Sequence, residues 1–434
     1  MDAFRRHGRQ LQHFVSRSCF CPRNGALAIT GVNSRHLDTW LMNRAVCREI
    51  FAHGCAGRDL AVIEGRFPAP DGSPPAGHGS PPAGSGGASS LDTLCDWLDV
   101  PRLVVLDVSR LNGCQLPERP AQIDGLLLDR VPSLSAAYYL QTSLESLWDV
   151  PVLGALGEAP KLRAAIDRLP CGAVPPWELC RELGNEFERF NRMDLIESVA
   201  ARRDMPDAPI AIFEPSGSRA AKRGVTVAVA YDAAFNCYFP DSLELLEIRG
   251  ANIVDFSPLR DEVLPDADVV YFGCGHPELF ADTLGGNQCM LLALRNHIRA
   301  GRRVYAEGGG LAYLCQRMET SAGALVPMVG ALPAVARLNR QMTPPTPVEA
   351  LLATNTWLAP AGTRLRGYLS GHWLLDPVGP LTRCLAGGDR SLDLVAQYNV
   401  LGSRLHLNFA AQSHLLQGFF KPRAAALASS IVAG

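Results

Sequence analysis

Short apolar runs recur along the chain and are separated by stretches long enough to form helices. The runs are rich in Val, Leu, Ile and Ala, which is typical of strands buried on both faces of a parallel sheet. Their alternation with helical segments predicts an α/β protein with doubly wound parallel sheets. The expected strands include Leu60–Glu64, Arg102–Asp107, Gly125–Leu128, Val150–Leu153, Val225–Ala230, Asn252–Phe256, Val269–Phe272, Arg302–Ala306 and Val400–Phe409.

The length of the chain indicates two such domains. A chain of 434 residues exceeds what one hydrophobic core normally organises. Residues 205–223 combine Pro, Gly and charged residues without periodicity, so we interpret them as a linker between domains 1–204 and 224–434. Residues 68–90 are rich in Pro, Gly and Ser and are expected to form a disordered loop in the first domain.

Two N-terminal segments are expected to be helical. Residues 1–14 have the pattern of the end of an amphipathic helix. Residues 34–56 are interpreted as a second helix, with Ser34 as its N-terminal cap.

Composition narrows the possible partners and location. The net charge is −2 and no basic stripe occurs, which argues against nucleic acid. The sequence has no apolar run of about 18 residues and no apolar core of a signal peptide near Met1, so we expect no membrane partner and a cytoplasmic location. The 13 cysteines include no Cys-x-x-Cys pair. We interpret them as reduced, buried thiols and predict no metal site.

A strand, a tight turn and a helix are expected around residues 302–316. The turn reads Tyr-Ala-Glu-Gly-Gly-Gly-Leu-Ala-Tyr-Leu over residues 305–314. It resembles the Tyr-Ala-Glu-Cys-Gly-Gly-Leu-x-Tyr-Leu elbow of the cobyrinic acid a,c-diamide synthase family, whose cysteine attacks the amide of glutamine. Gly308 stands at the position of that cysteine and has no side chain with which to form a thioester.

The resemblance extends over nearly the whole chain. It implies an N-terminal domain similar to dethiobiotin synthetase, here a truncated P-loop-type domain, and a C-terminal domain of the class I glutamine amidotransferase type. Such enzymes use ATP and magnesium to phosphorylate a corrin carboxylate, and ammonia from glutamine then displaces the phosphate. The blocks that carry the resemblance are Ser34–Met42, Asp59–Gly65, Tyr231–Pro240, Phe256–Glu262, Tyr271–Phe280 and Leu401–Phe409.

The glutamine-hydrolysing site departs from the family pattern at its nucleophile. His406 matches the family's histidine base and is retained, but without a thiol partner it is interpreted as a structural histidine. Gly273, Cys274 and Gly275 match the oxyanion turn, with Cys274 in place of a glycine. Cys274 is expected to lie on a different loop from the elbow, which disfavours it as a substitute nucleophile.

Two further positions bear on this site. Cys315 is expected about two turns into the helix after the elbow, too far away to act as nucleophile. The family's Arg-Gly-His-Glu-Phe-His-Tyr-Ser block corresponds to residues 366–373, where the His-Glu-Phe-His order is lost. His372 could replace one of those histidines only after a small shift in register.

The ATP side also departs from the family pattern. The sequence has no G-x-x-x-x-G-K-[ST] loop, and the resemblance places the family's first strand and phosphate loop before Met1. The family's Lys-x-Gly-Pro-Asp-Tyr-Ile-Asp-Pro block corresponds to Val15–Arg23, which lacks the lysine and both acidic residues. Glu64 and Asp71 are retained, either as ligand-binding residues or as relics, and no cofactor is predicted.

These losses affect both half-reactions while the structural positions remain, so we interpret the chain as a pseudoenzyme. It would act as a noncatalytic subunit, beside an intact synthase paralogue or as a homodimer, or as a binding protein for a corrinoid or another tetrapyrrole. Asp232, Asn236 and Tyr238 combine polar and aromatic groups that suit such a macrocycle, although packing within a turn explains them equally well. The alternative is an active, ammonia-dependent amidotransferase.

Overall fold

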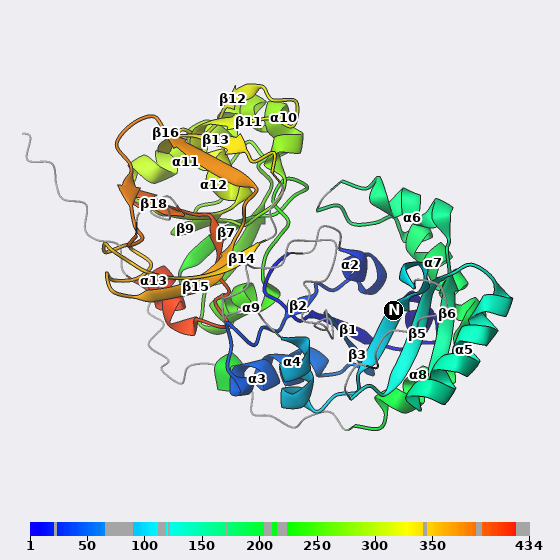
Figure 1. Cartoon of the computed structure of the whole chain (residues 1–434). Coiled ribbons are helices and arrows are strands. Elements are labelled where there is room, and N and C mark those ends of the chain that lie inside the picture. The colour runs from blue at the N-terminus through cyan, green and yellow to red at the C-terminus, as the bar shows by residue number, and fades with distance from the viewer. Residues whose placement is uncertain are drawn as a thin grey trace, which may run out of the picture. The chain divides into compact units, whose positions relative to one another are not determined.

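The computed structural model describes most of the chain in two compact units, with the boundary between Ala211 and Ile212. The described residues are 1–20, 24–65, 90–111, 119, 122–170, 172–203, 211–214, 224–341, 345–387 and 393–421. Most of the loop predicted at 68–90 and most of the linker predicted at 205–223 lie outside them. The predicted α/β class with parallel sheets is confirmed (Figure 1).

The first unit contains two three-stranded parallel sheets. One has the order β2-β1-β3 and the other the order β4-β5-β6. Leu126, Leu128 and Val152 of the second sheet pack with Leu144 and Trp148 of the helix α5 (Leu134–Trp148). The strands are β1 (Leu11–Val15), β2 (Arg35–His36), β3 (Leu60–Glu64), β4 (Leu103–Asp107), β5 (Gly125–Val131) and β6 (Val152–Gly157).

The helices of this unit correct the expectation for its N-terminus. Residues 1–14 contain a short helix followed by most of the buried strand β1. The helix expected at 34–56 begins at Arg44 instead of Ser34. The polar Gln12 and His13 conceal the strand in the sequence, yet both are buried with hydrogen-bond partners, and Ser34 Oγ lies 2.7 Å from His13 Nδ1. Asn43 provides the cap of α3. The helices are α1 (Asp2–Arg6), α2 (Gly25–Thr30), α3 (Arg44–Cys55), α4 (Leu91–Leu98), α5 (Leu134–Trp148), α6 (Pro160–Asp167), α7 (Trp177–Phe190) and α8 (Met193–Ala200), with a 3-10 turn η1 (Val108–Arg110).

The second unit is built on a seven-stranded sheet with the order β17-β18-β19-β10-β9-β7-β8 (Figure 1). The five strands from β19 to β8 are parallel, and β17 and β18 are antiparallel to their neighbours. These parallel strands are largely apolar, and β9 and β10 are fully buried, as their sequences predict. The strands of this sheet are β7 (Thr226–Ala230), β8 (Asn252–Phe256), β9 (Val269–Phe272), β10 (Arg303–Glu307), β17 (Thr382–Arg383), β18 (Leu394–Gln397) and β19 (Val400–Ser403).

Helices and two small sheets complete the second unit. The helices and 3-10 turns are α9 (Pro240–Ile248), η3 (Pro277–Phe280), α10 (Ala281–Gly286), α11 (Gln288–Arg299), α12 (Gly309–Leu314), η5 (Ser413–Leu416) and α13 (Gln417–Phe420), and the turn η2 (Ala211–Phe213) contains the boundary with the first unit. The sheet β12-β11-β13-β16 contains β11 (Cys315–Glu319), β12 (Leu325–Pro327), β13 (Leu332–Leu338) and β16 (Trp373–Pro377). The sheet β14-β15-β20 contains β14 (Thr346–Leu351), β15 (Arg364–Leu369) and β20 (Leu405–His406).

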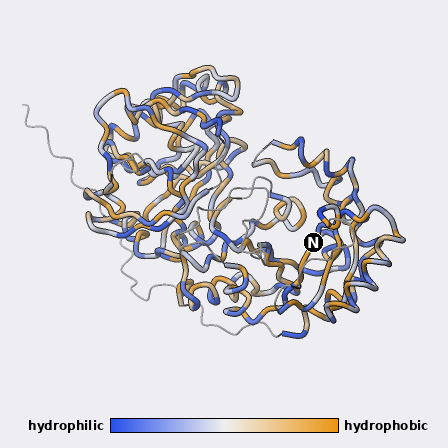
Figure 2. The backbone as a smooth tube through the Cα atoms, in the orientation of Figure 1, coloured by the Kyte–Doolittle hydropathy of each residue, from blue (hydrophilic) through white to orange (hydrophobic). Residues whose placement is uncertain are grey.

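Hydrophobic and hydrophilic segments alternate along the backbone of both units (Figure 2). Among the described residues, no helix has the length and apolar character needed to cross a membrane.

Candidate functional site

The elbow between β10 and α12 positions the candidate site. Gly308 has φ +50° and ψ −109°, in the left-handed half of φ that glycine adopts without steric penalty. Its N–H donates to the carbonyl oxygen of Ser403 over 2.8 Å. Because β10 lies between the parallel strands β9 and β19, the segments that follow these three strands meet at one edge of the sheet.

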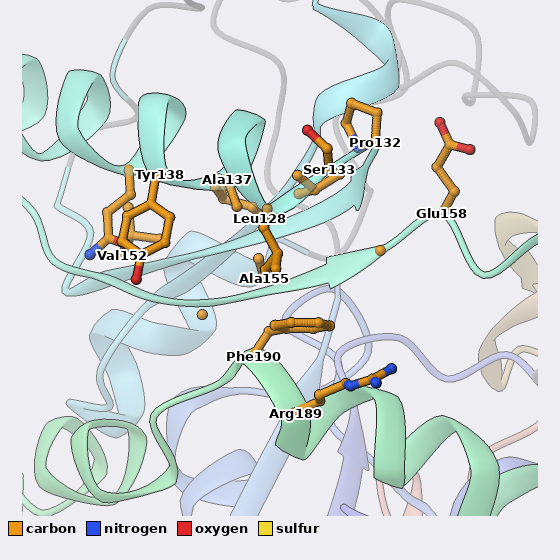
Figure 3. Close-up of a pocket in the computed structure, with 15 residues that line it drawn as sticks. Leu128, Pro132, Ser133, Ala137, Tyr138, Val152, Ala155, Glu158, Arg189 and Phe190 are labelled. Carbon is orange, nitrogen blue, oxygen red and sulfur yellow. The ribbon is translucent and has the colours of Figure 1, made fainter.

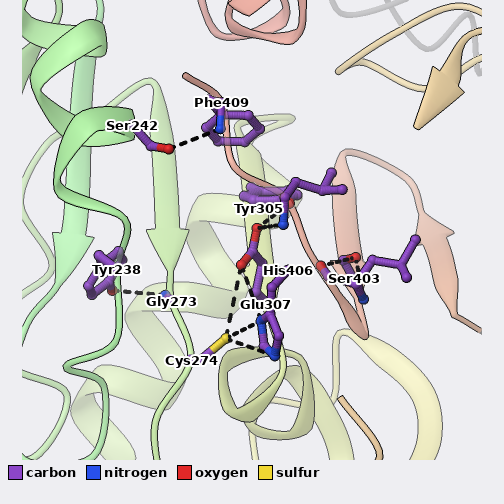
Figure 4. Close-up of polar contacts among 11 residues, drawn as sticks. Tyr238, Ser242, Gly273, Cys274, Tyr305, Glu307, Ser403, His406 and Phe409 are labelled. Carbon is purple, nitrogen blue, oxygen red and sulfur yellow. Dashed lines mark hydrogen bonds and ion pairs between the residues drawn. The ribbon is translucent and has the colours of Figure 1, made fainter. Parts of the chain in front are cut away.

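Cys274, Glu307 and His406 meet at this edge and are called here the Cys–Glu–His cluster (Figure 4). The sulfur of Cys274 lies 2.6 Å from His406 Nδ1 and 4.0 Å from Glu307 Oε2. Glu307 Oε2 lies 3.5 Å from His406 Nδ1. Glu307 Oε1 accepts hydrogen bonds from the hydroxyl of Tyr305 over 2.6 Å and from the N–H of Leu407 over 3.2 Å. The thiol and the buried carboxylate therefore both face the same ring nitrogen of His406, Nδ1.

Cys274 occupies the space beside the elbow. A Cβ atom on Gly308 would lie 3.1 Å from the sulfur of Cys274 and 3.1 Å from Cε1 of His406. A side chain at position 308 would thus enter the same space as this thiol. The expectation that His406 lacks a thiol partner is wrong. Strands β9 and β19 are parallel and flank β10, so the segments that follow them bring Cys274 and His406 together at one edge of the sheet.

Burial encloses the thiol of Cys274 and favours its neutral form. Cys274 is 7% exposed, Glu307 is 1% exposed and His406 is 5% exposed. Burial raises the pKa of the Cys274 thiol well above its ordinary value, and the negative charge of Glu307 adds to the effect. Since the thiolate is the nucleophilic form, these surroundings favour an inert cysteine.

The turn at Gly273–Gly275 uses its N–H groups within the protein. Gly273 N–H donates to the hydroxyl of Tyr238 over 2.8 Å, and Cys274 N–H donates to the carbonyl oxygen of Cys237 over 3.1 Å. An oxyanion hole needs N–H groups aimed at the developing charge. Two candidate donors of this turn are therefore directed to the segment that contains Cys237 and Tyr238.

Comparison with known proteins assigns the family. The sequence model of the CobB/CobQ-like glutamine amidotransferase domain matches residues 226–414. The cobyrinate a,c-diamide synthase of Syntrophotalea carbinolica is 30% identical over 384 residues, which cover 84% of this chain and 80% of that protein. The chain belongs to the cobyrinate a,c-diamide synthase family. The synthase of Salmonella typhimurium is 29% identical, with coverage of 90% and 86%, and that of Listeria monocytogenes strain F2365 is 29% identical, with coverage of 94% and 92%.

Within this family member, Asp232 organises its own loop. One carboxylate oxygen accepts from the N–H groups of Ala234 and Phe235 over 2.8 and 3.2 Å. The other accepts from Ser257 Oγ over 2.9 Å and from the N–H of Leu259 over 3.0 Å. These four contacts support the packing interpretation of Asp232, since both oxygens already have protein partners.

Asn236 and Tyr238 continue the same segment. Asn236 Oδ1 accepts a hydrogen bond from the thiol of Cys237 over 3.2 Å. Tyr238 is buried, and its hydroxyl donates to the carbonyl oxygen of Ala230 while it accepts from Gly273 N–H. Tyr238 therefore connects strand β7 with the oxyanion turn.

The retained acidic residues of the first unit have different outcomes. Glu64 ends β3 with a side chain that is 70% exposed, and its carboxylate lies 3.3 Å from Nε2 of the buried His13. Asp71 lies outside the described residues.

Cys315 is the first residue of β11 and not part of the preceding helix, and its sulfur contacts the carbonyl oxygen of Leu311.

A second group of polar side chains contains His372 together with His276 and Glu278, which the sequence did not single out. His276 Nδ1 and His372 Nε2 both lie 2.9 Å from Glu278 Oε1, and the three residues are called here the His–Glu–His cluster. Burial alone would raise the pKa of Glu278, but the two imidazoles lower it to about 2. His372 is far from the other two in sequence, and only the fold of the second unit brings it to them.

The first unit contains a cavity of 460 Å³ at the carboxyl ends of β5 and β6 (Figure 3). Tyr138 of α5 and Phe190 of α7 contribute aromatic faces, and Phe190 lies across the cavity from α5. Arg189 and Glu158 add charged groups to a lining that is otherwise mostly apolar. Ligands of open α/β sheets bind at such edges. Sequence reasoning missed this cavity because its small apolar residues form no motif.

Proposed function

We propose that this member of the cobyrinate a,c-diamide synthase family does not hydrolyse glutamine and acts as a noncatalytic binding protein for a tetrapyrrole of the corrinoid type. The observation that carries this proposal lies at the elbow, where Gly308 has no sulfur and the buried thiol of Cys274 occupies the adjacent space. The binding role draws on the relatives, which are synthases that act on cobyrinate. A noncatalytic subunit of an intact synthase is the second form of this proposal.

The 2.6 Å contact between Cys274 and His406 favours one competing function, a glutaminase with a relocated nucleophile. A thiol beside an imidazole is the arrangement of many nucleophilic cysteines. Three observations weigh against it here: the burial of the sulfur, its raised pKa, and the internal hydrogen bonds of the turn's N–H groups. We therefore favour the inert thiol.

Glutamine hydrolysis provides the direct test. The purified full chain, incubated with glutamine, is expected to release glutamate at the rate of the buffer alone, because no activated thiolate is available. The assay couples glutamate to a dehydrogenase and is repeated with cobyrinic acid and ATP–magnesium present. If the chain releases glutamate faster than the buffer alone and Cys274→Ser abolishes this release, the proposal is wrong and Cys274 acts as a relocated nucleophile.

Alkylation of the native protein tests the state of the thiol itself. Cys274 is expected to react with iodoacetamide at least about tenfold more slowly than the exposed Cys289, because burial and a raised pKa both reduce the reactive thiolate. Peptide mass spectrometry after timed labelling measures both rates in one sample. Preferential labelling of Cys274 over Cys289 would contradict the inert thiol.

Calorimetry tests the binding role and the ammonia-dependent alternative separately. We expect the full chain to bind cobyrinic acid without ATP–magnesium and to show no heat with ATP–magnesium alone. Binding of ATP–magnesium together with amide formation from ammonium would instead support an active, ammonia-dependent amidotransferase. If neither ligand binds, the binding role is wrong and the noncatalytic subunit remains, to be tested by co-purification with an intact synthase.

A further inference from the structure

Three potential metal ligands converge in the His–Glu–His cluster of the second unit. Their ligand atoms all lie within 4.8 Å of one another, and each imidazole nitrogen lies 2.9 Å from Glu278 Oε1. In a tetrahedral zinc site with bonds of about 2.0–2.1 Å, neighbouring ligand atoms are roughly 3.3 Å apart. Each imidazole nitrogen would therefore move about 0.4 Å away from Glu278 Oε1, and the two nitrogens, which lie within 4.8 Å of each other, would take the same spacing around the ion.

The carboxylate of Glu278 has an unused buried oxygen. The residue is 6% exposed, and among the described residues Oε2 has no hydrogen-bond partner. A buried charged oxygen without a partner is costly unless a donor or a cation satisfies it. This oxygen is independent evidence that the cluster is built for a positively charged ligand.

The backbone holds the three side chains in place and leaves one side open. His276 and Glu278 flank Pro277 at the start of η3, and the carbonyl oxygen of His372 accepts from the N–H of Asn339 over 2.9 Å. The side chains of both histidines are 23% exposed. An ion could enter from this side, and a water molecule could take a fourth coordination position.

We propose that His276, Glu278 and His372 bind a divalent transition-metal ion of the zinc type. Two imidazole nitrogens and one carboxylate favour such an ion over magnesium or calcium, which prefer ligand sets made entirely of oxygen. The ion would replace the two hydrogen bonds to Glu278 Oε1 and neutralise the buried carboxylate. This proposal goes beyond the proposed function and does not depend on it.

The Cys–Glu–His cluster is the competing metal site in this unit. Its three residues are each 7% exposed or less, so it has no open side for a further ligand. Both oxygens of Glu307 already have protein partners, through Tyr305, Leu407 and His406. These contacts favour the His–Glu–His cluster as the site of binding.

Metal titration of the chelator-treated full chain tests the proposal. Calorimetry with Zn²⁺ is expected to give one equivalent. Co²⁺, used as a spectroscopic probe, is expected to give the visible bands of a tetrahedral site without a cobalt–thiolate charge-transfer band. Glu278→Gln and His372→Asn are each expected to weaken Zn²⁺ binding by more than about 100-fold, since changes outside the ligand set already reach 10–100-fold.

Matched variants separate this site from its competitor. His414→Asn removes an exposed histidine of the same unit, and Cys274→Ser removes the thiol of the other cluster, so both are expected to bind Zn²⁺ like the unchanged chain. Circular dichroism without metal verifies that each variant is folded. Less than one equivalent of Zn²⁺, unchanged affinity in both ligand variants, or a charge-transfer band that Cys274→Ser abolishes would overturn the proposal.

Discussion

Exchanging the residues at positions 308 and 274, with Gly308→Cys and Cys274→Gly together, is expected to create glutaminase activity that neither the unchanged chain nor either single variant has. The double variant would carry its sulfur on position 308 beside His406 and would remove the thiol that now fills this space. A positioned general base contributes about 10²–10⁴-fold. We therefore expect glutamate release at least about 100-fold above that of the same double variant with His406→Asn added, measured by the coupled dehydrogenase assay.

The single variant Gly308→Cys and the removal of the base by His406→Asn provide the controls for this exchange. In Gly308→Cys the new Cβ lies 3.1 Å from the sulfur of Cys274, so two thiols compete for one space and no activity is expected. Adding His406→Asn to the double variant is expected to remove its gain. Equal activity in the single and double variants would show that Cys274 does not obstruct the site. A folded but inactive double variant would show that the glutamine site is lost beyond these two positions.

Gly275→Ala is expected to be among the most destabilising single substitutions in the second unit. Its Cβ would lie 2.0 Å from the carbonyl oxygen of Ala234, a backbone atom that cannot swing aside. Overpacking of this kind costs about 3 kcal/mol or more when the backbone must shift. Urea unfolding followed by tryptophan fluorescence is expected to show a lower midpoint for the transition of this unit.

Gly286→Ala is the matched control for that substitution. Gly286 is exposed at the end of α10, and a Cβ there meets no atom within 4 Å. The free energy of unfolding of Gly286→Ala is expected to stay within about 0.5 kcal/mol of that of the unchanged chain or to rise slightly, because alanine restricts the unfolded state. Equal effects of the two substitutions would contradict the steric account of the oxyanion turn.

Local pattern was enough to locate much of the fold. The strands expected at 252–256 and 269–272 have these bounds in β8 and β9, and β10 differs by one residue from the strand expected at 302–306. Continuous apolar runs make such strands visible because both faces are buried. Strand β1 was missed because Gln12 and His13 break the apolar pattern, and their burial depends on partners elsewhere in the unit.

The candidate site could be predicted only in part for a related reason. Asp232 was singled out as a ligand candidate from its residue type, yet its oxygens are engaged by Ser257 and Leu259, which follow a different strand. The Cys–Glu–His cluster needs β9, β10 and β20, and the His–Glu–His cluster needs the turn after β15. No spacing in the sequence encodes these distances.

The identity of residue 308 is enough to establish that the elbow has no sulfur, because glycine has no side chain. The sequence also establishes the family, through long ordered blocks that match known synthases. In contrast, the position of Cys274 next to Gly308, its contact with His406 and the sharing of one Glu278 oxygen by two histidines depend on the folded structure. The physical reason is that side chains at the ends of different strands become neighbours through the order of the strands in the sheet, which long-range packing fixes.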